Sequence, residues 1–91
     1  MYGILGTIFF TYKDEKNQKR QESFVLEENK TTFKVKGLNL VFTVKNIYYI
    51  VDTIYYVSIA FDNGREHTLY LSESIQFQYH KKHATMKLKV I

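Results

Sequence analysis

Apolar and polar residues alternate with a period of two along most of this 91-residue chain. The alternation is unbroken in residues 32–36, where Thr-Phe-Lys-Val-Lys places both apolar side chains on one face. This period is typical of a β-strand with one buried and one exposed face. Valine, isoleucine, threonine, tyrosine and phenylalanine fit a pleated surface, and they make up 38 of the residues, whereas alanine occurs twice. The sequence therefore predicts an all-β protein.

The alternating segments predict about seven to nine short antiparallel strands in a single small β domain spanning residues 1–91. A chain of this length supports one hydrophobic core, and it contains no proline and only four glycines to form a linker. Such strands pack as an antiparallel sandwich or close into a partly open barrel, and the pattern leaves both open. The alternating segments lie at residues 4–13, 24–26, 32–36, 38–45, 57–61, 65–71, 75–79 and 85–90.

The strongest local signal is the turn sequence Asp-Asn-Gly at residues 62–64. A two-residue loop would pair Ile59 with Thr68 and mix apolar with polar side chains on each face. A three-residue loop instead pairs Val57 with Leu69 and gathers the apolar side chains on one face. In such a loop a type I turn is followed by a left-handed residue, a position that glycine occupies without steric cost. We therefore expect a hairpin with a three-residue loop.

Two segments allow more than one interpretation. Residues 47–61 contain two Ile-Tyr-Tyr triplets, which form either a hairpin around Asp52-Thr53 or one long bent strand. Residues 72–83 largely keep the period of two, which predicts that they open a final hairpin. A short helix starting near Ser72 or Ser74 is the alternative, because serine is a favourable N-cap residue.

The first half of residues 47–61 is apolar on both faces of the predicted strand. Because an antiparallel sheet commonly leaves one face in water, these side chains need cover from a second layer or from a partner. We therefore expect a protein interface, which serves either an unidentified partner or self-association as a homodimer. The candidate interface residues are Tyr48, Ile50, Tyr56 and Tyr70, of which the last two lie opposite each other in the predicted register.

Net charge is concentrated at the C-terminal end of the chain. Acidic and basic residues balance up to Glu73, so the whole formal charge of +4 lies in residues 74–91. Basic side chains attract phosphates through counterion release, which makes a nucleic-acid-binding module the alternative function. A lysine-rich edge strand that prevents aggregation is the other interpretation. The candidate contacts for an anion or nucleic acid are His80, Lys81, Lys82, His83, Lys87 and Lys89.

The residue types that commonly catalyse reactions or bind metals are few in this chain. The chain has no cysteine and three histidines. His67 has no partner at a suitable spacing for a general base, and the lysines between His80 and His83 disfavour a bound cation. The scattered glycines do not form a phosphate-binding loop. We therefore expect no catalytic residues, no metal and no cofactor.

Together these features indicate a small non-enzymatic binding protein, such as an inhibitor or accessory factor. The abundance of lysine, isoleucine, tyrosine, phenylalanine and asparagine is typical of AT-rich genomes such as those of phages and mobile elements. No segment approaches the roughly 20 apolar residues that span a bilayer, so no membrane contact is expected. The absence of cysteine fits a reducing compartment, and we expect a cytoplasmic protein.

Overall fold

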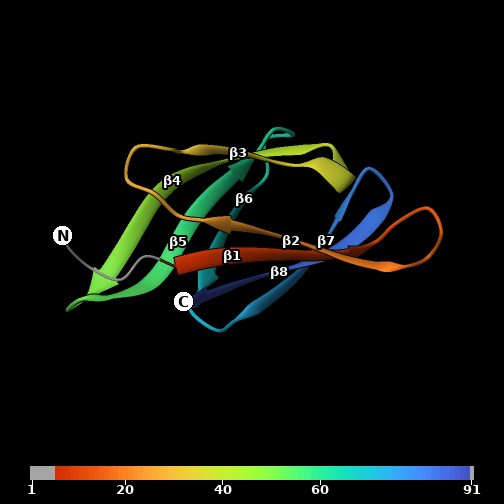
Figure 1. Ribbon diagram of the computed structural model, residues 1–91. Helices are drawn as coiled ribbons and strands as arrows, with labels where there is room; N and C mark the ends of the chain where they lie inside the picture. The colour runs from red at the N-terminus through yellow and green to blue at the C-terminus, as the bar shows by residue number, and fades with distance from the viewer. Residues whose placement is uncertain (1–5, 91) are drawn as a thin grey trace.

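Eight β-strands make up most of the computed structural model, which describes residues 6–90 (Figure 1). The all-β prediction and the predicted number of strands are confirmed. Ile4 and Leu5 of the predicted first strand lie outside the described residues. The strands are β1 (Gly6–Lys13), β2 (Lys19–Val25), β3 (Thr32–Val35), β4 (Leu40–Ile50), β5 (Thr53–Phe61), β6 (Glu66–Tyr70), β7 (Ser74–Tyr79) and β8 (Lys82–Val90).

The strands form two antiparallel sheets with the orders β2-β1-β8-β7 and β3-β4-β5-β6. The sheets pack as the two layers of a sandwich, and strands of the two layers run in clearly different directions (Figure 1). A bridge between Leu71 and Leu88 joins the layers beside β6 and β8. The first and last strands are neighbours, because Phe10 of β1 pairs with Met86 of β8.

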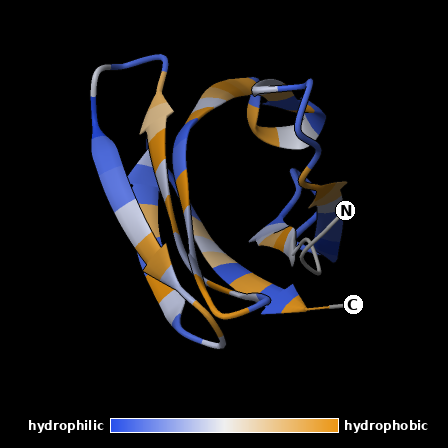
Figure 2. Cartoon of the chain, turned by 90° about the vertical axis from the view of Figure 1, so that its left-hand side faces the viewer, coloured by the Kyte–Doolittle hydropathy of each residue, from blue (hydrophilic) through white to orange (hydrophobic). Residues whose placement is uncertain are grey.

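The core lies between the inner faces of the two sheets. Hydrophobic and hydrophilic bands alternate along each strand (Figure 2), so each strand turns its apolar side chains to the same interior. Phe10 of β1 meets Phe42 of β4 with ring centroids 5.1 Å apart, and this contact joins the two layers. The fully buried large side chains are Ile8, Phe10, Leu26, Val35, Leu40, Phe42, Ile54, Val57, Ile59, Leu69, Met86 and Leu88.

The hairpin of β5 and β6 has the predicted register. Val57 pairs with Leu69, and the Phe61 backbone N–H donates to the carbonyl oxygen of Arg65 at 2.7 Å, which closes the three-residue loop. Gly64 has a φ of +90°, the left-handed conformation that the argument from turn geometry requires. The hydrophobic pattern was therefore sufficient to determine this register.

Residues 47–61 form a hairpin, so the alternative of one long bent strand is wrong. The turn residues are Val51 and Asp52, one position before the predicted Asp52-Thr53. Tyr48 pairs with Tyr56, whereas the next residue, Tyr49, pairs with Ile54, so β5 skips one residue between the two pairs. Tyr55 is therefore the extra residue of a β-bulge, and the strand presents two successive tyrosines on one face.

The chain ends in the predicted hairpin, here formed by β7 and β8, and the alternative of a short helix near Ser72 or Ser74 is wrong. Its two turn residues, His80 and Lys81, have φ values of 49° and 69°. Two consecutive positive values are characteristic of the tight turn that matches strand twist. The connection between β3 and β4 is a 3-10 turn at Lys36–Leu38.

Candidate functional site

Four tyrosines gather on the outer face of the β3-β4-β5-β6 sheet. Tyr48, Tyr56 and Tyr70 form one row across three adjacent strands. Tyr48 stacks on Tyr56 with centroids 5.1 Å apart, and Tyr56 and Tyr70 are 5.3 Å apart. The bulge brings Tyr55 onto the same face, 5.3 Å from Tyr70. We call these four residues, together with the neighbouring Ile50, the tyrosine surface.

The tyrosine surface is open to water in the isolated chain. Tyr48, Tyr55 and Tyr70 are 48%, 43% and 39% exposed, and Ile50 is 49% exposed. At roughly 200 Å² for a whole aromatic side chain, these three tyrosines leave about 250 Å² in water, and Ile50 adds to that area. The paired residues of the next row on this face are the uncharged Asn46, Ser58 and Thr68, and the exposed Lys45 lies at a second bulge beside Asn46.

All four predicted interface residues therefore lie on one face of one sheet. Sequence reasoning missed Tyr55, because strict alternation directs it away from Tyr56 and only the bulge reverses that direction. Tyr49 projects from the other face of β4, where it pairs with the buried Ile54. It is 36% exposed but does not belong to the tyrosine surface.

The predicted basic C-terminal segment is divided by the fold. The Lys82 ammonium donates to the carbonyl oxygen of Gly37 at 3.3 Å, so this side chain is engaged at the 3-10 turn. His80 and Lys81 lie at the hairpin turn. The remaining candidates share one outer face on β8, because alternation places them opposite the buried residues of that strand. They are His83, Lys87 and Lys89.

Two lysines from the first hairpin join this face. Lys13 and Lys19 are direct cross-strand partners. Phe9 pairs with Lys87 and therefore shares its face. Lys13 is four residues from Phe9 in the same strand, so it lies on that face too. We call Lys13, Lys19, Lys87 and Lys89 the lysine face. The sequence analysis ended the first alternating segment at Lys13 and began the next at residue 24, so it missed the pairing of Lys13 with Lys19.

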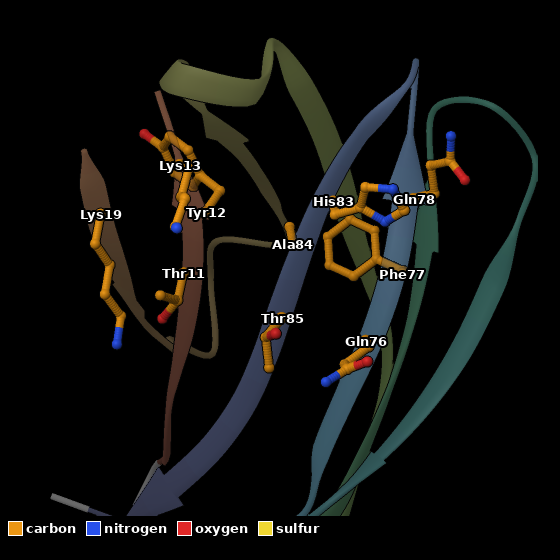
Figure 3. A pocket seen from close by; sticks show the side chains of 10 residues that line it. All are labelled: Thr11, Tyr12, Lys13, Lys19, Gln76, Phe77, Gln78, His83, Ala84 and Thr85. Atoms are coloured by element: carbon orange, nitrogen blue, oxygen red, sulfur yellow. The ribbon is translucent and has the colours of Figure 1, made fainter. Parts of the chain in front are cut away.

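The lysine face is hollowed by two adjoining grooves of about 660 and 350 Å³. Both are lined by Thr11, Lys19 and Thr85, so they form one continuous depression. Figure 3 shows Thr11, Thr85 and Gln76 in a row across its floor, with Lys19 on one side. The floor thus carries uncharged donors and acceptors, and the lysines lie along its length.

Carboxylates are directed away from the lysine face. Within the four strands of this sheet the only carboxylate is that of Glu22, which lies on the inner side. It accepts hydrogen bonds from the Tyr12 hydroxyl and from the backbone N–H groups of Lys36 and Gly37. Burial and this carboxylate raise the pKa of Tyr12 to about 12. Glu22 therefore connects the two sheets and does not compensate the lysine charges, and Asp14, in the loop between Lys13 and Lys19, pairs with Arg20 at 2.8 Å.

The remaining histidine, His67, lies in β6. His67 packs against Phe61 at 4.8 Å, and burial, with a smaller effect of Arg65, lowers its pKa. Among residues 6–90, three or more histidines, aspartates or glutamates nowhere lie close enough to hold a metal ion. That same part of the chain contains no helix with the length and hydrophobicity to cross a membrane.

The tyrosine surface and the lysine face lie on the outer faces of different sheets, so an apolar and a cationic surface are separated by the sandwich. No protein-family model and no curated protein sequence matches this chain.

Proposed function

We propose that this chain is a small non-enzymatic binding protein that acts through a protein interface at the tyrosine surface. One observation supports the proposal: of the eight large apolar side chains that residues 6–90 leave exposed, four belong to the tyrosine surface, namely Tyr48, Ile50, Tyr55 and Tyr70. Contiguous apolar patches on a monomer commonly mark binding sites. Tyrosine is enriched at protein interfaces because its ring is apolar and its hydroxyl can remain hydrated.

The charge distribution favours a second copy of this chain as the occupant. The cross-strand row beside the tyrosines pairs uncharged residues, with Lys45 at the bulge at its end, and the lysine face belongs to the other sheet. Two copies can therefore dock with their tyrosine surfaces together and their lysines on opposite outer sides. The two lysine faces then do not meet across the interface, even though each chain carries a formal charge of +4. Such a contact is isologous, with the same patch used twice.

The small area of the patch indicates a weak and reversible dimer. About 250 Å² of exposed tyrosine, widened by its uncharged neighbours, falls below the roughly 800 Å² per partner of a standard interface. We expect a dissociation constant in the micromolar range. A paired module of this kind fits the role of an inhibitor or accessory factor, and we propose the cytoplasm as its setting because the chain has no cysteine.

Sedimentation velocity between about 10 and 500 μM tests the proposal in the concentration range expected for a weak interface. The parent protein should shift with concentration from 10.9 kDa towards twice that mass. The double variant Tyr48→Ser/Tyr70→Ser should remain monomeric, because it removes two rings from the tyrosine surface. Its circular dichroism spectrum and urea midpoint show whether the fold is intact.

Tyr49→Ser is the matched control, because it removes a tyrosine of similar exposure from the other face of the same strand. This variant should dimerise like the parent. A parent protein that stays monomeric at the highest concentration would overturn the proposed dimer. Equal loss of dimer in the Tyr49→Ser control would also overturn it, because the tyrosine surface would then have no special part.

A further inference from the structure

We propose that the lysine face binds single-stranded nucleic acid along the depression between its two ends. Nucleic acid was the alternative ligand that the charge of the C-terminal segment suggests. The fold assigns that role to a different set of residues, because it removes Lys82, His80 and Lys81 from this surface and adds Lys13 and Lys19. The proposal does not depend on the dimer.

The spacing of the lysines requires an elongated ligand. Lys89 pairs with Thr7, six residues along β1 from Lys13, and six residues of antiparallel strand span about 20 Å. Lysines at opposite ends of that distance cannot converge on one small anion. A chain of phosphates can contact both ends, and at the roughly 3.4 Å per nucleotide of a stacked strand the distance corresponds to at most about six nucleotides, and to fewer for an extended single strand.

The lysine pair at one end of the face gives a second reason for a bound anion. Lys13 and Lys19 are direct cross-strand neighbours, and like charges in that position destabilise a sheet. The four strands supply no outward carboxylate to compensate them. A phosphate between the two ammonium groups relieves the repulsion, so binding an anion is favoured at this end.

The floor of the depression favours a single strand over a duplex. Its side chains are uncharged hydrogen-bonding groups, among them Gln76, Thr11 and Thr85, which can pair with the edges of unstacked bases. The half-buried ring of Phe9 adjoins them, with the Lys89 ammonium 5.7 Å from its centroid. An aromatic ring beside a cation is a stacking position for a base. In a duplex the bases are stacked on one another, so none is free to stack on Phe9.

Fluorescence anisotropy with a labelled 12-nucleotide DNA strand, about twice the length of the site, tests the proposal. At low salt the parent should bind with a dissociation constant below about 100 μM, within the range of non-specific binding. The Lys13→Ala/Lys87→Ala variant should bind more weakly. Its log–log salt slope should be smaller by about 1.4, which corresponds to two phosphate contacts on a single strand.

The matched control is Lys34→Ala/Lys81→Ala, which removes the same charge from exposed positions outside the lysine face. This control should keep the parent's salt slope. Equal weakening by both double variants would overturn the proposal, because net charge alone would then explain binding. Absence of binding by the parent at 100 μM would also overturn it, and thermal melts establish that each variant is folded.

Three further probes distinguish the ligands. A single strand of the same length with abasic sites keeps the phosphates and should bind several-fold more weakly than the intact strand. A duplex of equal length and poly-glutamate should also bind more weakly. Equal affinity for the abasic strand, the duplex or poly-glutamate would overturn the assignment to single-stranded nucleic acid. The Tyr48→Ser/Tyr70→Ser variant should still bind the strand, so failure of the dimer and failure of this site are separate results.

Discussion

Replacement of Gly37 by alanine should destabilise the fold through a clash with Tyr12. A β-carbon at position 37 would overlap the hydroxyl and ring of Tyr12. That ring is only 8% exposed, and its hydroxyl donates to the Glu22 carboxylate, which also accepts from the Gly37 N–H at 2.8 Å. The ring or the turn must therefore move, and either movement breaks part of the connection between the sheets.

The size of the effect follows from those contacts. Loss of a hydrogen bond to a charged group costs about 1.5–3 kcal/mol, and overpacking costs about 1–3 kcal/mol. Because the two terms describe partly the same displacement, we expect Gly37→Ala to lower the free energy of unfolding by about 2–4 kcal/mol. Gly37 does not have a positive φ, so backbone strain contributes nothing to this cost.

A double-mutant cycle with Tyr12→Leu, followed by urea denaturation, tests the reasoning. Leucine lacks the outer part of the ring, so the added methyl group of Gly37→Ala has space in that background. The substitution should then be neutral or stabilise by up to about 1 kcal/mol, because alanine restricts the unfolded chain more than glycine does. An equal loss of stability in both backgrounds would refute the clash with Tyr12.

Two further perturbations have defined outcomes. Gly64→Val should destabilise by more than about 1 kcal/mol, because a β-branched residue resists a φ of +90° although the site has open space; an unchanged urea midpoint would contradict this. Hydrogen bonding to Asp62, with burial, raises the pKa of Tyr79 to about 12, as burial and Glu22 do for Tyr12. Since unfolded tyrosine ionises near pH 10, stability should hold below about pH 10 and fall between pH 10 and 12. Tyr79→Phe should make that fall shallower, and urea melts across this range measure it.

The sequence alone determined the structural features that depend on residues close together in the chain. The alternation of apolar and polar side chains identified most of the strands and the faces that they bury, because the side-chain period of a strand is a local property. The register of the β5–β6 hairpin followed from the same pattern and from the conformational freedom of Gly64. The row of Tyr48, Tyr56 and Tyr70 could be partly anticipated, since two of its members face each other in that register.

Only the tertiary structure decided which distant segments share a surface. The bulge at Tyr55 reverses a direction that alternation would assign, and the lysine face exists because β1 lies between β2 and β8. Lys13 and Lys87 are 74 positions apart in the sequence, and no local pattern specifies that their strands are neighbours. Strand formation depends on local periodicity, whereas strand order depends on how all the buried faces pack together. It is the strand order that brings the four lysines of the lysine face together.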